Sequence, residues 1–356
     1  MFVCLFLQTQ CVITFGCSRE LGSSGKSVVL CEKEDDLLAG ASSGNTGHVA
    51  SNFYYRPSRA PLEAEMSEIA RKINQHWIDS QPAVPCVRRG MIYLAKGEEE
   101  EVAMKKLLDL GQLNNVEGIR ELSLAEVAGM EPLLSLDGVT AALFSGNEAI
   151  VDPWLLAMTH VYGMEVAGVE IMTGCEVLGV RREGSGWTVD TGRGAIQAAC
   201  VVNCGGNQGD QVEMMVEKVF LDFLYCFIIF YYQESSFTIT PGKGEYIVFS
   251  MASKGTISRP VVPVPGKQSA GLYVFETAYG HTVVGPTNIS QTSKTDRLVS
   301  TASQETLLAH LFSLYPSMKT ARPVGLFPGL RPATQHQDYC IGIDLDRGWV
   351  TVGGIR

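Results

Sequence analysis

The sequence predicts an α/β protein with two domains, and three observations support this fold class. The chain has 356 residues, whereas a single hydrophobic core stops growing near roughly 250 to 300 residues. It opens with two continuous apolar runs separated by a helix-length segment, a pattern typical of a βαβ unit whose parallel strands are covered on both faces. From Val169 onward, short strands separated by turns replace this pattern.

The predicted βαβ unit lies at the amino terminus. Its first strand is the apolar run Phe2 to Leu7, and a mixed segment through Leu21 supplies the helix. The turn Gly22 to Gly25 leads into the second strand, Ser27 to Cys31, which ends on Glu32. Because both strands are apolar throughout, we expect them in the interior of a parallel sheet.

Three later segments have the composition and spacing of helices: Arg59 to Ser80, Glu98 to Leu110 and Ser303 to Tyr315. In the second of them a run of glutamates precedes two lysines, which suits the helix dipole. Strands are predicted at 169–174, 176–184, 186–192, 200–206, within 237–286, and at 348–354.

Charge and cysteine usage exclude several functions. The formal net charge of −10 and the absence of a basic run argue against a nucleic-acid-binding surface. The ten cysteines are scattered without a CxxC pair or a metal-ligand spacing, so no metal site is predicted. We expect them to be reduced and mostly buried, which indicates an intracellular protein, cytoplasmic or mitochondrial.

Two apolar stretches, Phe2 to Phe15 and Val219 to Tyr232, require a membrane test. Both are shorter than the ~20 apolar residues of a spanning helix, and the second contains Asp222. The first lacks a basic region before it and so makes a poor secretory signal. No transmembrane span is therefore predicted.

Glu32 is the first residue that suggests a ligand. An acid at the carboxyl end of the second strand of a βαβ unit can hold the ribose hydroxyls of a dinucleotide, although a strand ending in an acid is more often a solvated edge. The glycine fingerprint expected after the first strand is absent, because its three positions carry Thr9, Cys11 and Thr14. Side chains there hinder the approach of a pyrophosphate to the backbone.

The segment Gly40 to Gly47, GASSGNTG, changes this interpretation. Its small residues permit close backbone approach, and its hydroxyls offer donors to a phosphate or a flavin edge. Together with Glu32 it forms EKEDDLLAGASSGNTG, which resembles the second FAD-contacting segment of the D-amino-acid oxidase superfamily of FAD-dependent oxidoreductases. The similarity is greatest to its glycerol-3-phosphate dehydrogenase and L-2-hydroxyglutarate dehydrogenase branches.

Further stretches resemble the same family in the same order. They are IVDPWLL (150–156), Glu176–Val177, VVNCGG (201–206) with Asp210, ITPGKGEY (239–246), VVGPT (283–287), GLRPAT (329–334) and VGGIR (352–356). Single motifs of this kind are modest, whereas the ordered set is specific. The resemblance covers roughly residues 19 to 215 and 236 to 356.

The resemblance implies a Rossmann-like FAD-binding domain of the glutathione-reductase type, with an inserted α+β substrate domain of mixed sheet. It places the FAD-binding domain at 1–55, 146–215 and 325–356, and the substrate domain at 56–145 and 236–324. Residues 216–235 are an atypical apolar insertion relative to the family. The resemblance also implies FAD contacts at Glu32, Lys33, Ser42, Ser43, Asn45, Thr46, Gly47, Val177, Gly205, Gly206, Gly353, Gly354, Ile355 and Arg356.

Arg331, in the GLRP segment, is the candidate for holding an anionic substrate. A guanidinium is always charged and offers a planar fork of donors to a carboxylate or phosphate; an internal ion pair is the alternative. His336 lies five residues further on and is a second catalytic candidate, because histidine titrates near neutrality. A structural role for this histidine stays open.

Two departures from the family concern the flavin site and the surface. The run Val219 to Tyr232 predicts an exposed apolar patch of the kind that marks an interface or an aggregation hazard. The sequence ends at Arg356, where the family continues into a glycine-led helix that faces the flavin pyrimidine and stabilises a reduced flavin. These features predict an incomplete or mis-spliced gene product.

By resemblance, the expected activity is the removal of hydride from the CH–OH group of a small anionic substrate, glycerol 3-phosphate or a 2-hydroxy acid. Oxygen or a quinone would be the electron acceptor. Two alternatives stay open: an FAD-dependent amine or amino-acid oxidase, and a degenerate, non-catalytic chain whose flavin site is broken.

Overall fold

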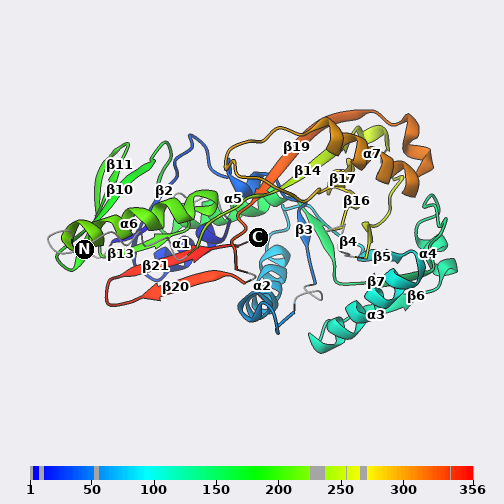
Figure 1. Ribbon diagram of the computed structural model, residues 1–356, viewed down its shortest axis with the longest axis horizontal. Helices are drawn as coiled ribbons and strands as arrows, with labels where there is room; N and C mark the ends of the chain where they lie inside the picture. The colour runs from blue at the N-terminus through cyan, green and yellow to red at the C-terminus, as the bar shows by residue number, and fades with distance from the viewer. Residues whose placement is uncertain are drawn as a thin grey trace.

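A six-stranded sheet forms the half of the molecule that contains the amino terminus (Figure 1). The computed structural model describes residues 3–7, 12–51, 56–224, 237–253, 255–264, 271–336 and 338–355. The strand order is β20-β21-β13-β1-β2-β9, parallel throughout except for β20 at the edge. The strands are β1 (Val3–Leu7), β2 (Ser27–Cys31), β9 (Glu170–Met172), β13 (Cys200–Asn203), β20 (Cys340–Asp344) and β21 (Trp349–Gly353).

The side chains of the central strands point alternately to the two faces of this sheet and form a core on each face. Leu5 and Leu7 of β1 pack against helix α6 (Gly209–Leu224) and a small sheet made of β10 (Val177–Glu183), β11 (Gly186–Thr191) and β12 (Gly194–Ala198). Phe6 of β1 points to the other face, toward helices α1 (Val12–Ser23) and α5 (Pro153–Val166). Successive side chains of a strand point to opposite faces, so a strand that is covered on both faces must be apolar throughout.

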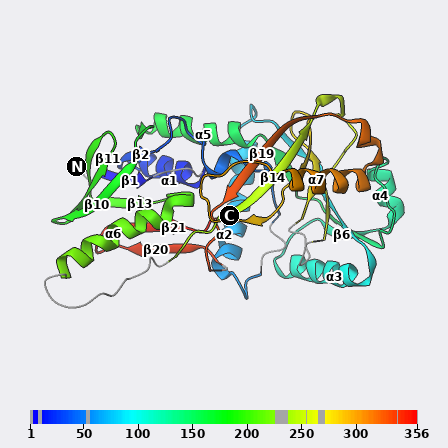
Figure 2. The same cartoon turned by 45° about the horizontal axis from the view of Figure 1, so that its top comes forward.

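A mixed nine-stranded sheet forms the other half of the molecule (Figures 1 and 2). Its order is β18-β14-β17-β16-β15-β5-β7-β6, with β19 also paired to β14, and β15 runs parallel to β5. The strands are β5 (Met91–Ala95), β6 (Ile119–Leu122), β7 (Ala141–Ser145), β14 (Gly242–Phe249), β15 (Val261–Pro263), β16 (Tyr273–Glu276), β17 (Thr282–Gly285), β18 (Ile289–Ser290) and β19 (Pro323–Arg331).

Helices α4 (Leu124–Met130) and α7 (Thr301–Leu314) pack against one face of this sheet, and α3 (Gly97–Leu113) packs over β5 and β7. A three-stranded sheet in the order β3-β8-β4 lies near the middle of the molecule, beside helix α2 (Pro61–Asp79) (Figure 1). Its strands are β3 (His48–Val49), β4 (Cys86–Arg88) and β8 (Ala149–Val151). Short 3-10 helices occur at Ala41–Ser43, Gly206–Gln208, Met251–Ser253 and Pro316–Thr320.

The predicted fold class is confirmed; the helix of the predicted βαβ unit is α1, and the three later predicted helices correspond to α2, α3 and α7. Two predicted boundaries differ from the structure. Residues 325–331 were expected in the flavin domain but belong to β19, which pairs with β14 in the nine-stranded sheet. The expected insertion from 216 begins inside α6, which continues to Leu224; residues 225–236 lie outside the described part of the chain.

Among the described residues, no helix is long and apolar enough to cross a membrane. In the same part of the chain, no group of three or more histidine, cysteine, aspartate or glutamate side chains is placed to hold a metal ion.

Candidate functional site

The carboxyl ends of five parallel strands meet at one edge of the six-stranded sheet. Reading across the sheet, β9, β2, β1, β13 and β21 follow the order 3-2-1-4-5 of a doubly wound dinucleotide fold. Ligands of such folds bind outside the carboxyl ends of the strands, where the order reverses. Glu32 follows β2, Gly205 follows β13, and Gly353 ends β21, so the topology brings these three predicted FAD contacts to one edge.

Glu32 is fully buried, yet its carboxylate is only half satisfied. Its Oε1 accepts a hydrogen bond from the Glu34 backbone at 3.0 Å, whereas its Oε2 has no partner among the described residues. Burial is the main cause that raises the pKa of Glu32 to about 7. An unsatisfied buried carboxylate oxygen at this edge is an acceptor for a ligand hydroxyl.

The backbone around Glu32 joins it to the predicted adenine-binding segment. The Cys175 amide donates to the Glu32 carbonyl at 2.8 Å, and two residues later Val177 begins β10 as a buried side chain. The Lys33 ammonium lies 3.3 Å from the Glu34 carboxylate, so this lysine forms an ion pair with a neighbouring residue of the chain.

The predicted flavin loop, Gly40 to Gly47, uses several of its side chains to hold its own shape. Ser43 Oγ donates to the Gly40 carbonyl at 2.8 Å, and Asn45 Nδ2 donates to the Ser42 carbonyl at 2.6 Å. Asn45 Oδ1 accepts from the Gly47 amide at 2.7 Å, and Thr46 Oγ1 accepts from the His48 amide at 3.2 Å. The side chains of Ser43, Asn45 and Thr46 therefore shape the loop.

The flavin loop touches strand β19 backbone to backbone. A Cβ on Gly44 would lie 2.3 Å from the Pro328 carbonyl oxygen, and a Cβ on Gly329 would lie 1.8 Å from the Gly44 carbonyl oxygen. No side chain fits at either position. The contact brings the loop next to the end of β19, where Arg331 lies.

The turn after β13 reaches the same place. Gly206 has a φ of +53°, and the following Asn207 donates through Nδ2 to the Leu330 carbonyl at 3.1 Å. Asn207 Oδ1 and Gln208 Oε1 are buried without a partner among the described residues. These two acceptors, like Glu32 Oε2, would be satisfied by a bound ligand or by water.

The end of β21 also lies close to the segment that follows Arg331. Gly354 has a φ of +70°, and a Cβ there would lie 3.1 Å from Thr334 Cγ2, three residues beyond Arg331. In Figures 1 and 2, β19 and β21 both run toward the middle of the molecule and end near each other. Ile355 follows, whereas Arg356 lies outside the described residues.

Arg331 lies on the face of β14 that carries Gly242, Gly244 and Tyr246. A Cβ on Gly244 would lie 2.8 Å from Arg331 Nη2, so the glycine leaves room for the guanidinium. The pKa of Tyr246 is raised by burial, and the nearby Arg331 guanidinium opposes this effect. Arg331 has no carboxylate partner within ion-pair distance among the described residues, so the alternative of an internal ion pair is not supported.

Tyr246 and Asn207 were missed as candidates from the sequence. Tyr246 ends a stretch that resembles the family and Asn207 directly follows another, but only the pairing of β14 with β19 brings the tyrosine to Arg331. No local spacing signals that contact.

His336 lies in an exposed turn, where its backbone amide and carbonyl bond the Thr334 hydroxyl at 3.3 Å each. Its role as a catalytic candidate stays a prediction. Lys243, an alternative anion holder, points to the opposite face of β14 from Arg331. It is 7% exposed and ion-paired with Asp296 and Glu245 at 3.3 and 3.4 Å, so it is already neutralised.

At the first turn of α1, Thr14 is fully buried and its Oγ1 has no partner among the described residues. This is the third position of the missing glycine fingerprint, and the structure accommodates the threonine inside the domain. Thr9 and Cys11, the other two positions, lie outside the described residues.

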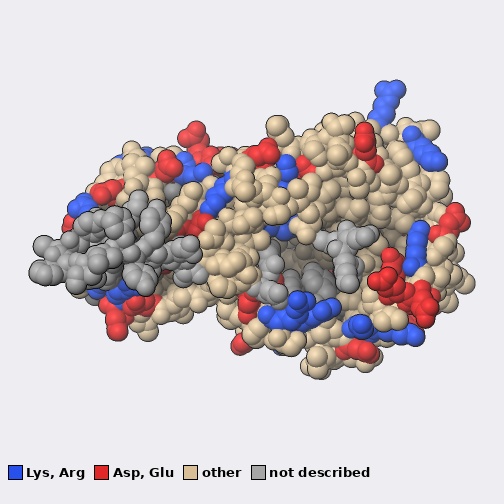
Figure 3. Space-filling view, viewed as in Figure 1, with Lys and Arg blue, Asp and Glu red and all other residues tan. Residues whose placement is uncertain are grey.

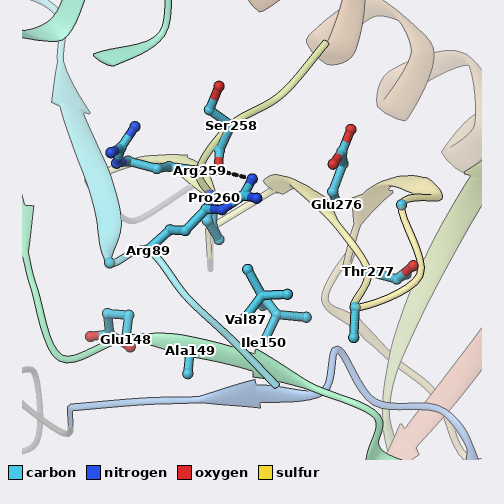
Figure 4. A pocket seen from close by; sticks show the side chains of 13 residues that line it. Val87, Arg89, Glu148, Ala149, Ile150, Ser258, Arg259, Pro260, Glu276 and Thr277 are labelled. Atoms are coloured by element: carbon cyan, nitrogen blue, oxygen red, sulfur yellow. Dashed lines mark hydrogen bonds between the residues drawn. The ribbon is translucent and has the colours of Figure 1, made fainter. Parts of the chain in front are cut away.

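The visible surface carries acidic and basic side chains that are intermixed (Figure 3). A cavity of about 170 Å³ opens between the three-stranded sheet and the β16–β17 turn. Figure 4 shows Val87, Arg89, Glu148 and Ile150 around it, with Arg89 bonded to the Ser258 carbonyl.

Comparison with known proteins identifies a family. The model of the family DAO, described as FAD dependent oxidoreductase, matches residues 13–355. A glycerol 3-phosphate dehydrogenase of Caloramator mitchellensis is 24% identical over 96% of this chain and 68% of its own length. An L-2-hydroxyglutarate dehydrogenase of Indibacter alkaliphilus is 24% identical, and the match spans 67% of this chain and 55% of the relative.

Solved structures share the fold. The FAD-bound L-alpha-glycerophosphate oxidase of Mycoplasma pneumoniae superposes with a TM-score of 0.85 at 21% identity, over 99% of this chain and 88% of that one. Glycine oxidase of Geobacillus kaustophilus superposes with a TM-score of 0.82 at 22% identity, with the same coverages.

Proposed function

The chain belongs to the DAO family of FAD-dependent oxidoreductases, and from this premise we propose that it oxidises the CH–OH group of a small anionic substrate. Glycerol 3-phosphate and 2-hydroxy acids are the substrates we favour. Relatives named glycerol 3-phosphate dehydrogenase and L-2-hydroxyglutarate dehydrogenase support this choice, although the chain spans 68% and 55% of their lengths.

The described residues fit the FAD of this family. We assign the ribose hydroxyls to the free Oε2 of Glu32 and the adenine to the backbone near Val177. The turn at Gly205 and Gly206 would face the diphosphate, and the flavin loop with Gly353 to Ile355 would enclose the ring. When bound, FAD supplies a hydride acceptor that oxygen or a quinone can reoxidise.

The proposal of an anionic substrate rests on Arg331. It is an arginine without a carboxylate partner among the described residues, and it lies beside the flavin loop through the contact of Gly44 with Gly329. Its planar fork can orient a carboxylate or phosphate, and Tyr246 supports it from β14. The role of this side chain is to hold the anionic end of the substrate, so that the carbon to be oxidised is kept in one orientation.

An amine or amino-acid oxidase is the main alternative. A glycine oxidase of Geobacillus kaustophilus is 25% identical over 89% of this chain, and a guanidinium would hold the carboxylate of an amino acid equally well. The third candidate is a non-catalytic chain, which Thr14 at a fingerprint position favours.

One experiment separates the three. The purified chain is titrated with FAD, and the visible absorption and fluorescence of bound flavin are recorded. Turnover is then measured with a redox dye on glycerol 3-phosphate, L-2-hydroxyglutarate, glycine and sarcosine. We expect flavin binding and turnover of a hydroxy substrate; turnover of only the amines favours the oxidase, and absence of flavin binding favours the non-catalytic chain.

A further inference from the structure

A buried polar cluster lies where the flavin loop enters the three-stranded sheet. Its centre is the carboxylate of Glu148, whose side chain is 0% exposed. Glu148 Oε2 lies 2.5 Å from His48 Nε2, and Oε1 accepts from the hydroxyls of Ser51 at 2.5 Å and Ser145 at 3.0 Å. The two hydroxyls also lie 2.9 Å from each other.

Every oxygen of this buried acid is therefore satisfied. Burial disfavours the charged form of Glu148, but His48 and Ser51 outweigh it and hold the pKa of the carboxyl below its usual range. Loss of such partners would leave a buried charge without compensation and would strongly destabilise the folded protein. The carboxylate thus ties its partners together for as long as it stays ionised.

Two of the partners lie at the ends of one short segment, residues 48–51, which directly follows the flavin loop. The backbone pairs this segment with β8 at only two positions, His48 with Ile150 and Val49 with Ala149. So short a ladder fixes a segment weakly. Glu148, in the turn that precedes β8, grips the segment at both ends through side chains.

The same cluster touches the wall of the site that carries Arg331. The ring of His48 meets Tyr273 of β16 edge-on, with ring centroids 5.6 Å apart. Tyr273 pairs with Gly285, and a Cβ on Gly285 would lie 2.8 Å from the ring of Tyr246, the partner of Arg331. Figure 4 shows Glu148 at the edge of the neighbouring cavity, below Arg89.

We propose that Glu148 is a positioning residue for FAD binding: by holding His48 and Ser51, it sets the place of the flavin loop relative to the wall that carries Tyr273, Tyr246 and Arg331. The inference rests on the proposed function, because it takes the loop to be part of the flavin site. In this proposal Glu148 acts through His48 and Ser51.

The test compares two buried glutamates. Glu148→Gln keeps the size and part of the hydrogen bonding but removes the charge. The control is Glu131→Gln: Glu131 is 1% exposed, accepts from the Ser258 amide at 3.0 Å and from Tyr315 Oη at 3.2 Å, and packs on the opposite face of the nine-stranded sheet. Both changes lower the stability of the FAD-free protein, so thermal unfolding measures the purely structural effect.

The deciding measurement is the Kd for FAD, obtained from quenching of flavin fluorescence. We expect Glu148→Gln to raise it by on the order of tenfold, the loss associated with one charge-assisted hydrogen bond, and Glu131→Gln to leave it unchanged. Glu148→Asp, which keeps the charge on a shorter side chain, recovers part of the affinity. His48→Gln weakens FAD binding similarly, and adding it to Glu148→Gln gives less than the sum of the two effects, because both act through one contact.

The outcomes distinguish this inference from the proposed function. An unchanged Kd in Glu148→Gln, or an equal rise in Glu131→Gln, overturns the positioning role alone. Wild-type protein that binds FAD but oxidises no hydroxy substrate overturns the proposed function alone. Wild-type protein that binds no FAD overturns both.

Discussion

The six-stranded sheet and the nine-stranded sheet present their functional groups in different ways. In the first, Glu32, Gly205 and Gly353 all stand at the carboxyl ends of parallel strands, so one edge collects them. In the second, Tyr246 lies within β14 and Arg331 at the end of β19, and only the antiparallel pairing of these strands joins them. Residues at the ends of parallel strands are brought together by the order of the strands, whereas residues within antiparallel strands are brought together by the register of their pairing.

Two buried acids, Glu32 after β2 and Glu148 before β8, differ in whether their oxygens are satisfied. Glu32 keeps one oxygen without a partner among the described residues, and burial raises its pKa to about 7. Both oxygens of Glu148 are bonded, and its pKa is lowered. An unsatisfied acid is suited to receive a ligand, and a satisfied acid is suited to hold the protein in place.

The largest effect is expected where the two regions touch, at Gly44. In Gly44→Ala the new Cβ would meet the Pro328 carbonyl oxygen at 2.3 Å, so the flavin loop must leave β19. We expect a loss of about 3 kcal/mol or more, equivalent to over a hundredfold in FAD affinity, together with a lower Tm. Gly16→Ala is the control, because nothing lies within 4 Å of its Cβ. Unchanged FAD binding in Gly44→Ala would mean that FAD binding does not depend on this contact.

Within the second region, Arg331→Ala should raise the apparent KM for an anionic substrate by on the order of a hundredfold. Arg331→Lys keeps the charge but loses the fork, so it recovers only part of the loss. Kinetics are measured on FAD-loaded protein, with Arg120→Ala as the control at an exposed ion pair. Wild-type KM and kcat in the alanine variant would assign the anion to another residue.

Within the first region, Glu32→Ala should weaken FAD binding by about tenfold, the effect of one or two hydrogen bonds to a charged acceptor. We expect the protein to stay folded, because the change removes one hydrogen bond, that from the Glu34 amide to Oε1, while Oε2 has no partner among the described residues. FAD affinity is measured by flavin fluorescence, and an unchanged value would contradict the assignment of Glu32 to the ribose.

The raised pKa of Glu32 adds a dependence on pH. An acid whose pKa rises from 4.5 to about 7 on folding binds its proton more tightly in the folded chain. Its contribution to the free energy of unfolding of FAD-free protein is therefore largest below pH 4.5 and declines as the pH rises to about 7. Urea unfolding across this window should show a shallower decline for Glu32→Gln; identical curves would show that Glu32 does not titrate there.

The sequence predicted more of the first region than of the second. The apolar runs of β1 and β2, Glu32 and the GASSGNTG loop are local patterns, and the structure keeps them as strand, strand end and loop. Arg331 and Tyr246, which lie close enough to affect each other's charge, are 85 residues apart by their numbers, and the bonded pair His48 and Glu148 is 100 apart. Contacts of this kind arise from strand pairing, which no local spacing encodes.

The smallest effect is expected from the apolar run Val219 to Tyr232, and the geometry of α6 explains why it can be removed. Phe237 lies near the amino end of α6, because a Cβ on Gly209 would be 3.7 Å from its ring. The carboxyl end of the 16-residue helix therefore lies about 24 Å from Phe237, at 1.5 Å per residue.

Deleting Val219 to Tyr232 shortens α6 to ten residues, since it then ends at Lys218. The distance from the end of the shortened helix to Phe237 falls to about 15 Å. The four remaining residues before Phe237 reach roughly 17 Å when extended, which is enough to span it. We expect soluble, folded protein whose Tm lies within about 3 °C of the wild type, because the six-stranded sheet and its core contacts at Val212 and Val216 remain. Circular dichroism and gel filtration measure this. Aggregation or loss of the cooperative transition would show that the run belongs to the core of the first region.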